Sequence, residues 1–326
     1  MKVYIFTEGG FTSGLGHVVR CSSLYDVLVS RGINVELIIH GDEGIEEVIQ
    51  NRKCTITNWL SIDYLSSLVD SQVYCVVDSY LANPNMCKFV FEHSLRTLFI
   101  DDIKRMKYPG GIVVNPSIYT DDLHYPEIRD EDCLLGNEYV ILRNSFKNCP
   151  KKYIHNEVKE ILVTLGGSDT RNLTPTILNS LKSEYPASIK HVIISKSFGN
   201  IDKITTILDE KIKYHFNVSG VEMRDLMLDC DIAISAAGQT IYELIQTGTP
   251  FIPIKIIDNQ ENNVKGILKY KCANRVLDSE SIDIHLDLLS ELAWIMNPNS
   301  RRTLNANMNG IIDGSGSERI INKLLI

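Results

Sequence analysis

The sequence predicts an α/β protein made of two Rossmann-like domains. Short apolar runs alternate with helical patterns along the chain, which is typical of a parallel sheet covered by helices on both faces. A polar stretch at 143–157, which contains Pro150, interrupts this alternation. The same order of strand, glycine turn and helix then starts again. We therefore expect one domain at 1–145 and a second at 155–326.

The first half is expected to form a sheet with helical crossovers, because its apolar runs are short and its helical patterns lie between them. Strands are predicted at 2–7, 35–40, 54–59, 73–78, 97–101, 112–115 and 139–142. Helices are predicted at 17–30, 44–51, 62–70 and 86–94.

The second half repeats this organisation and ends in further helical patterns. Strands are predicted at 161–165, 191–195, 213–217, 232–235, 251–257 and 275–277. Helices are predicted from 173 onward and at 222–229, 240–247, 262–271, 284–296, 301–308 and 317–325. We expect the last helix to cross back to the first domain. Two such sheets are expected to leave a cleft at the carboxyl ends of their strands, where open α/β sheets bind ligands.

Composition excludes several classes of function. The chain has 326 residues, 44% hydrophobic and 23% charged, with a formal net charge of −8. No run of Lys and Arg stands out, which disfavours nucleic-acid binding. No apolar stretch is long enough for a signal peptide or a membrane span. The eight cysteines form no CxxC pair, so we expect reduced thiols in a cytoplasmic protein. The histidines are scattered, so neither a metal nor a cofactor is expected; a monomer is compatible with the sequence.

The first glycine turn, Gly14-Leu15-Gly16-His17, follows the opening apolar run and precedes a helix. Glycines let the backbone turn tightly and approach a ligand. The positive field of a helix N-terminus disfavours imidazolium, so His17 is expected to be neutral and able to act as a base. Arg20 lies one turn further along. The alternative is that His17 merely caps or packs.

Two further glycine turns follow strands in the second half. The turn with Gly167 and Ser168 suits a phosphate, although it lacks the Lys of a Walker motif. Its alternative role is a tight turn with Asp169 or Asn172 capping the next helix. The other turn, which opens a helix, contains Ala237, Gly238, Gln239 and Thr240.

Polar side chains at strand ends complete the candidate site. Glu243 lies about one helical turn inside its helix, where a carboxylate suits the vicinal hydroxyls of a ribose; the alternative is a first-turn acid that complements the helix dipole. Asn259 and Gln260 suit a hydroxyl-rich or acetamido ligand, or cap a helix. Asp78, Tyr80, Asp101, Asp102 and Asn115 follow strands of the first half, where single instances are more often turn residues.

These motifs occur in a fixed order: GxGHxxR, VVDSY, IDD, CLLGNEYVILR, ILVTLGGSDTRNLT, AISAAGQTIYELIQTGTP, DNQ and IIDGSGSERII. Together they resemble the UDP-2,4-diacetamido-2,4,6-trideoxy-β-L-altropyranose hydrolases of pseudaminic acid biosynthesis and the related spore-coat polysaccharide proteins. The resemblance covers nearly the whole chain. It implies a GT-B fold like that of the lipid II N-acetylglucosaminyltransferase.

The resemblance also implies a metal-independent hydrolase that releases UDP from a UDP-sugar. Its essential histidine falls on His17. Its uridine and diphosphate contacts fall on Gly167, Ser168, Ala237, Gly238, Gln239, Thr240 and Glu243. Its sugar and diphosphate contacts fall on Gly14, Gly16, Arg20, Asp78, Tyr80, Asn259 and Gln260. Two alternatives remain: a GT-B glycosyltransferase, in which His17 deprotonates an acceptor hydroxyl, and a nucleotide-sugar binding protein without activity.

Overall fold

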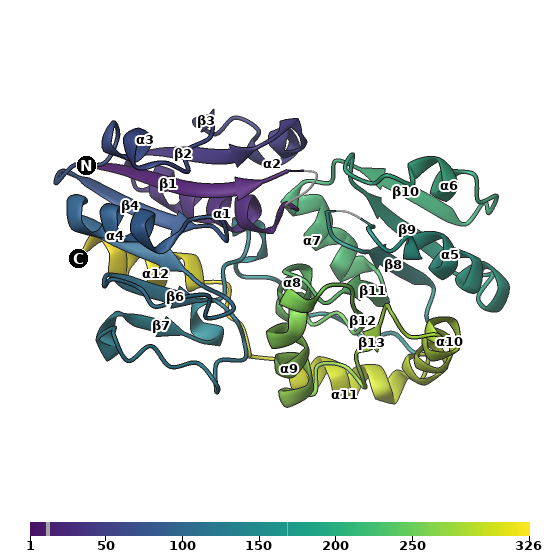
Figure 1. Cartoon of the computed structure of the whole chain (residues 1–326). Helices are drawn as coiled ribbons and strands as arrows, with labels where there is room; N and C mark the ends of the chain where they lie inside the picture. The colour runs from purple at the N-terminus through teal and green to yellow at the C-terminus, as the bar shows by residue number, and fades with distance from the viewer. Residues whose placement is uncertain (11–13, 168) are drawn as a thin grey trace. The chain divides into compact units, whose positions relative to one another are not determined.

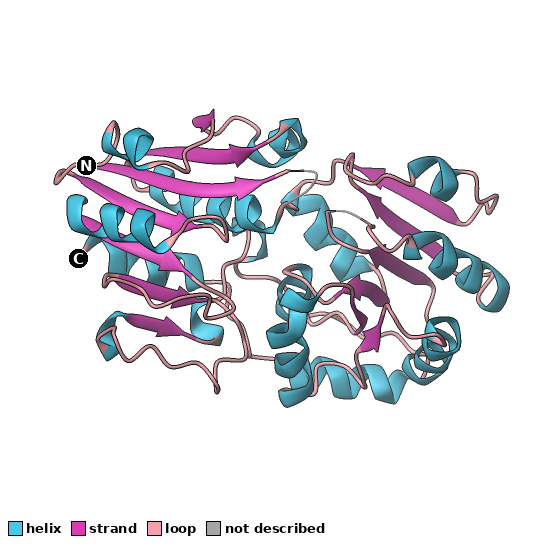
Figure 2. Ribbon diagram, in the orientation of Figure 1, coloured by secondary structure: helices cyan, strands magenta, loops and turns pink. Residues whose placement is uncertain are grey.

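The computed structural model describes residues 1–10, 14–167 and 169–326. The chain divides into two compact units, which we describe one at a time (Figure 1). The first unit comprises residues 1–144 and 314–326, and the second comprises 145–313. Each unit holds one parallel sheet with helices along it (Figure 2), so the predicted α/β fold class is confirmed.

The sheet of the first unit has the order β3-β2-β1-β4-β5-β6-β7, and every pair of neighbouring strands is parallel. The chain builds outward from β1 to β3 and then restarts at β4 on the other side of β1. The carboxyl ends of β1 and β4 therefore form a topological switch point, where open sheets bind ligands. The strands are β1 (Lys2–Gly9), β2 (Asn34–Gly41), β3 (Cys54–Ile56), β4 (Val73–Asp78), β5 (Arg96–Ile100), β6 (Ile112–Asn115) and β7 (Cys133–Leu135).

Alternate residues of β1 enter two separate cores on the two faces of this sheet, as the period of a strand requires. Val3 and Ile5 pack in one core, which also contains apolar residues of the first and last helices of the unit. Tyr4 and Phe6 pack in the other core. The helices are α1 (Gly16–Ser30), α2 (Glu46–Ile49), α3 (Ile62–Ser66), α4 (Pro84–His93) and α12 (Gly316–Leu325).

The sheet of the second unit has the order β10-β9-β8-β11-β12-β13, again parallel throughout. Its switch point lies between β8 and β11. The strands are β8 (Glu160–Thr164), β9 (Ile189–Ile194), β10 (Ile212–Phe216), β11 (Ile232–Ala236), β12 (Phe251–Lys255) and β13 (Leu277–Asp278). The helices are α5 (Leu173–Glu184), α6 (Ile201–Thr205), α7 (Gly220–Asp229), α8 (Thr240–Thr247), α9 (Glu261–Lys269), α10 (Ile284–Ile295) and α11 (Pro298–Met308).

Two predicted strands of the first unit are wrong in position or length. The apolar run Tyr139–Leu142 is not a strand; the seventh strand is the earlier run β7, and Gly136, with a φ of 101°, ends it before a 3-10 turn. The strand predicted to reach Trp59 ends at Ile56, and Trp59 instead donates its indole N–H to the Thr7 carbonyl (2.8 Å). Both errors arose because buried loop residues are as apolar as strand residues.

Helix boundaries also differ from the prediction in places. α3 ends at Ser66 rather than at residue 70, and the short α6 was not predicted. None of the helices that the structure describes combines the length and the apolar character needed to cross a membrane.

Candidate functional site

The first glycine turn connects β1 to α1. The Gly10 N–H donates to the Gly14 carbonyl (3.1 Å), which brings the two ends of the turn together. Gly14 has a φ of 73°, a left-handed conformation that favours glycine. Gly16 is the first residue of α1, and His17 is therefore in its first turn. This turn places the histidine at the switch point of the first sheet.

His17 forms a buried polar cluster with two side chains predicted for the site. Its Nδ1 lies 2.7 Å from Asp78 Oδ1, and Asp78 is the last residue of β4. Arg20, one turn along α1, donates from Nε to Asp78 Oδ2 and from Nη2 to Asp78 Oδ1, both at 2.6 Å. This fork is the bidentate geometry of strong guanidinium–carboxylate pairs. Asp78 is fully buried, so its oxygens serve Arg20, His17 and the Cys21 thiol (3.4 Å).

A second carboxylate, Asp102, completes the cluster. Arg20 Nη1 donates to Asp102 Oδ2 and the Tyr80 hydroxyl donates to Asp102 Oδ1, both at 2.7 Å. The rings of Tyr80 and His17 meet edge to face with centroids 4.5 Å apart. The switch point thus gathers one histidine, one guanidinium, two carboxylates and one phenol from β1–α1, β4 and β5.

The charges of the cluster fix the ionisation of its members. Burial acts to raise the pKa of Asp78, but the charge of Arg20 and the hydrogen bonds of Arg20 and His17 outweigh it and hold that pKa well below its usual range. The pKa of Asp102 is lowered in the same way, against burial, chiefly by Arg20. Burial and the charge of Asp102 raise the pKa of Tyr80 far above its usual value. Both carboxylates are therefore anionic and the phenol is protonated at neutral pH.

Three further polar residues hold the loops around this cluster. Glu8 is buried and accepts hydrogen bonds from the Ser79 hydroxyl and the Tyr80 N–H (2.8 Å). Asp101 accepts from the Arg105 N–H (3.1 Å), and Asn115 donates to the Asp101 carbonyl (2.6 Å). Asp101 and Asn115 thus stabilise loops through hydrogen bonds, as expected of turn residues. Glu8 was not singled out from the sequence, because a single acid at the end of an apolar run reads as a surface residue.

The second glycine turn follows β8 at the switch point of the second sheet. Gly166 has a φ of 84°, and Gly167 is partly exposed. Asp169 is buried and accepts from the Leu173 N–H (2.8 Å) and the Thr174 N–H (2.9 Å). The expected alternative for this acid, a cap of the following helix, is therefore correct. Ser168, which was predicted to contact phosphate, lies outside the described residues.

The third glycine turn follows β11, the neighbour of β8. The Ala237 N–H donates to the Ile254 carbonyl (2.8 Å), so this amide belongs to the sheet and is not available to a ligand. Gly238, Gln239 and Thr240 are partly exposed at the start of α8, where the first N–H groups of a helix lack partners within it. Glu243 is buried in the first turn of the same helix.

The two predicted amides differ in environment. Asn259 is exposed, whereas Gln260 is buried and accepts from the Ile256 N–H (2.8 Å) through Oε1. A Cβ on Gly238 would lie 3.6 Å from Gln260 Nε2, so Gln260 borders the third glycine turn. The structure thus brings Gly167, Gly238 and Gln260 to one end of the second sheet.

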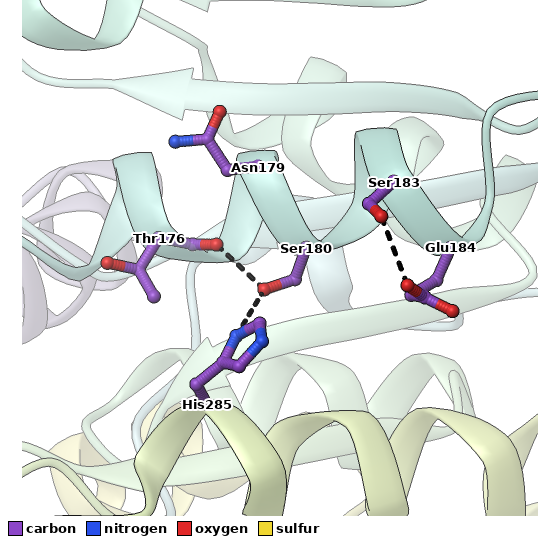
Figure 3. Close-up of a pocket in the computed structure, with 6 residues that line it drawn as sticks. All are labelled: Thr176, Asn179, Ser180, Ser183, Glu184 and His285. Carbon is purple, nitrogen blue, oxygen red and sulfur yellow. Dashed lines mark hydrogen bonds between the residues drawn. The ribbon is translucent and has the colours of Figure 1, made fainter.

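A surface pocket of about 280 Å³ between α5 and α10 offers a different arrangement (Figure 3). In it His285 Nδ1 lies 3.0 Å from Ser180 Oγ. The Ser180 hydroxyl donates to the Thr176 carbonyl (2.9 Å), so His285 is the donor in this pair and does not activate the serine. We therefore do not assign a nucleophile to this pocket.

Solved structures place the fold among glycosyltransferases and sugar-nucleotide epimerases. MurG of Acinetobacter baumannii is 12% identical, with a TM-score of 0.61, over 100% of this chain and 99% of its own. The UDP-GlcNAc 2-epimerase of Neisseria meningitidis, solved with UDP-GlcNAc, is 12% identical with a TM-score of 0.59 over 100% of both chains. These likenesses confirm the predicted GT-B fold class.

Curated relatives are similar to the chain in sequence, and no family model matches it. It is 27% identical to the bifunctional pseudaminic acid cytidylyltransferase and UDP-2,4-diacetamido-2,4,6-trideoxy-β-L-altropyranose hydrolase of Helicobacter pylori, over 80% of this chain and 45% of that protein. It is 23% identical to the spore coat polysaccharide biosynthesis protein SpsG of Bacillus subtilis, over 81% of this chain and 80% of SpsG. An uncharacterized protein of Methanocaldococcus jannaschii is 27% identical over 88% of this chain and 64% of that protein. The chain thus spans under two thirds of the length of the first and last of these.

These similarities confirm the resemblance to the UDP-sugar hydrolase family and its spore-coat relatives that the motifs indicated.

Proposed function

We propose that this protein is a sugar-nucleotide enzyme that hydrolyses a UDP-diacetamido-trideoxyhexose, releasing UDP and the free sugar. The observation that carries the proposal is the pair of His17 and Asp78 at the switch point of the first sheet. The similarity to the Helicobacter pylori protein, which is named as a hydrolase of such a sugar, supports the substrate class.

In the proposed mechanism His17 is the general base. His17 Nδ1 lies 2.7 Å from Asp78 Oδ1 and 2.9 Å from Arg20 Nη2. In the proposed tautomer Nδ1 carries a proton and donates to the anionic Asp78, so the lone pair of the neutral ring lies on Nε2. Among the described residues Nε2 has no hydrogen-bond partner, which leaves it available to water. Water attacks the anomeric carbon and gives its proton to Nε2, while the bond from that carbon to the diphosphate oxygen breaks and UDP leaves. A positioned general base typically raises the reaction rate by about 10²–10⁴-fold.

Arg20 keeps this arrangement fixed. A guanidinium does not lose its proton in a protein, so Arg20 remains a donor and keeps Asp78 anionic at neutral pH. Its fork restrains the Asp78 carboxylate from rotating away from the imidazole. We therefore assign Asp78 and Arg20 to positioning His17, which differs from the sugar and diphosphate contacts that the resemblance implied for them.

The second unit is proposed to bind UDP. The backbone at Gly238, Gln239 and Thr240, where α8 begins, and the turn at Gly167 suit a diphosphate, which their N–H groups would stabilise as it departs. Glu243 is proposed to accept hydrogen bonds from the ribose hydroxyls. This backbone cradle supplies the stabilisation that a divalent cation provides elsewhere, so activity is expected in the presence of a chelator.

The runner-up function is glycosyl transfer from the same class of donor. The fold is shared with glycosyltransferases, and the neutral imidazole serves an acceptor hydroxyl as well as water. Incubating the purified protein with the UDP-sugar alone separates the possibilities. Catalytic release of UDP supports the hydrolase, turnover that requires an added acceptor supports the transferase, and binding without turnover supports a binding protein.

The test of the base is His17→Asn, which retains a polar side chain but takes up no proton at neutral pH. We expect kcat to fall by at least about 10²-fold while UDP affinity stays unchanged. The control is His93→Asn, because His93 is an exposed residue of α4 whose ring lies against Phe89 of the same helix and within 2.9 Å of the Phe89 carbonyl. Near-wild-type turnover of His17→Asn would show that His17 is structural.

A further inference from the structure

The second unit contains a cluster of metal-ligating side chains at the end of its sheet remote from the glycine turns. Glu160 begins β8, His191 lies in the adjacent β9, and Cys230 lies between α7 and β11. Their ligand atoms all lie within 4.8 Å of one another, and among the described residues this is the one group of its kind. No local sequence pattern indicates this group, because the three residues are far apart in the chain.

The backbone explains why these residues meet. The Asp231 N–H donates to the Glu160 carbonyl (2.8 Å), so the start of β11 lies beside the start of β8 and brings Cys230 next to Glu160. In the register of β8 and β9, His191 pairs with Leu162, which points to the same face as Glu160 two residues earlier. Two of the three side chains thus lie on neighbouring strands, and Cys230 lies two residues before the start of the next strand, β11.

We propose that Glu160, His191 and Cys230 bind one divalent transition-metal ion, in the first place Zn²⁺, with a water in the fourth position. Carboxylate oxygen, imidazole nitrogen and thiolate sulfur are the three ligand types of protein zinc sites. A tetrahedral site places such ligand atoms about 3.3–3.6 Å apart. His191 Nε2 and Glu160 Oε2 are already 3.1 Å apart. The partly exposed Glu160 side chain has room to adjust around an ion.

A neighbouring histidine orients the imidazole ligand. His191 Nδ1 lies 3.0 Å from His215 Nε2 on β10, and the two rings are stacked with centroids 5.1 Å apart. When His215 Nε2 accepts a hydrogen bond from His191 Nδ1, the lone pair of His191 lies on Nε2, on the side of Glu160. Metal-binding histidines usually donate an outer hydrogen bond of this kind, most often to a carboxylate, a carbonyl or water; here the acceptor would be an imidazole.

The charges around the cluster are mixed. The carboxylates of Glu160, Asp229 and Asp231 act on it, against the ammonium groups of Lys152 and Lys213. Burial raises the pKa of the Cys230 thiol, and the binding of the ion must offset this cost. A surface pocket of about 400 Å³, lined by His215 and Asp229 among others, lies beside the histidine that stacks on His191. Binding requires Cys230 to give up its proton to solvent, so one proton is released for each ion bound.

The site is separate from the proposed chemistry. Glu160 starts β8 and the glycine turn follows its end, so the two are roughly 15 Å apart along the strand. The ion would act on the stability of the second unit and not on UDP release. Failure of this proposal would therefore leave the proposed hydrolase untouched.

The experiment titrates the full chain, stripped with a chelator, with ZnCl₂ by calorimetry and with CoCl₂ by absorption spectroscopy. We expect one ion per chain, a thiolate-to-cobalt charge-transfer band, and a higher Tm with Zn²⁺. Cys230→Ser is expected to abolish the band and weaken Zn²⁺ binding by at least about 100-fold. His215→Phe should weaken it by about 10–100-fold, as changes to such outer partners do.

The matched control is Cys272→Ser, since Cys272 is also a buried thiol of the second unit. It should bind Zn²⁺ and Co²⁺ like the wild type. Glu160→Gln, at a partly exposed position, provides a second ligand variant should Cys230→Ser fail to fold. The proposal is overturned if the wild type binds no stoichiometric ion, or if binding and the cobalt band persist in Cys230→Ser or Glu160→Gln.

Discussion

The substitution Asp78→Asn tests whether a buried carboxylate sets the state of His17. Asn keeps the size of the side chain but offers one acceptor oxygen in place of two. Asp78 accepts from Arg20 Nε and Nη2 at 2.6 Å, and its Oδ1 lies 2.7 Å from His17 Nδ1, which donates in the proposed tautomer. An amide NH₂ in the place of either oxygen faces one of these donors. The variant must therefore lose at least one buried hydrogen bond and leave a donor unpaired.

The expected magnitudes follow from burial and from the remaining partners. Removing one member of a buried ion pair costs about 3–5 kcal/mol. In Asp78→Asn, Arg20 still has Asp102 at 2.7 Å as a counter-charge. We therefore expect the free energy of unfolding to fall by about 3 kcal/mol, the lower end of this range. The effect on catalysis should be larger than this loss suggests, because the imidazole loses its fixed tautomer. We expect kcat to fall by at least about 10²-fold, since the equivalent change in a serine-protease triad costs about 10⁴.

The stability difference should also depend on pH. The pKa of Asp78 is lowered in the folded protein, so its contribution is fully present above the unfolded pKa of about 3.9 and is lost as pH falls through the lower folded value. The gap in unfolding free energy between wild type and Asp78→Asn should therefore be constant from about pH 7 to pH 5 and shrink below about pH 4. Urea titrations at a series of pH values measure it.

A suitable control is Asp101→Asn, because Asp101 is another buried acid of the first unit and contacts neither His17 nor Arg20. Burial raises the pKa of Asp101, so this carboxylate should show no comparable loss on acidification. Its turn needs an acceptor, which Asn supplies. Our account would be refuted if Asp78→Asn released UDP at the wild-type kcat, or if its stability gap were independent of pH down to pH 2.

Three other outcomes are expected. Glu243→Ala should weaken UDP binding measured by calorimetry, because buried ribose hydroxyls would lose their acceptor, and unchanged affinity would remove Glu243 from the site. Tyr80→Phe should lower kcat by about 5–10-fold without changing the fold, because it removes one hydrogen bond, worth about 1 kcal/mol, that holds Asp102 beside Arg20. If the variant and the wild type have the same kcat, the phenol is not needed. Turnover should continue in excess chelator, whereas a strict requirement for Mg²⁺ would contradict the proposed amide cradle.

The fold was largely predictable because its elements carry local signals. Val73–Asp78, Ile112–Asn115 and Thr240–Thr247 have the predicted bounds, since each is a short apolar or periodic run ended by turn residues. The strand predicted at 139–142 failed because the burial of Val140 comes from loop packing, which sequence periodicity does not separate from a strand.

The sequence suggested candidate site residues but not the contacts among them. Glycine turns indicate where His17 and Gly238 lie, because open α/β sheets bind ligands at such turns beside a switch point. The pairing of Asp78 with His17 depends on two strands meeting in register, which no local pattern encodes. The same limit hid Asp102 as a partner of Arg20, and it hid the cluster of Glu160, His191 and Cys230 altogether.

The return of the chain to the first unit depends on one close contact, which gives a last prediction. Gly316 is the first residue of α12, and a Cβ there would lie 2.2 Å from the Val140 carbonyl oxygen, so a backbone must move to admit a side chain. Gly316→Ala should lower the stability of the first unit by about 1–3 kcal/mol, the usual cost of overpacking. Gly199→Ala is the control, because nothing lies within 4 Å of its Cβ position. Equal urea midpoints for the two variants would show that α12 adjusts without loss, and the contact would then not determine how the helix docks.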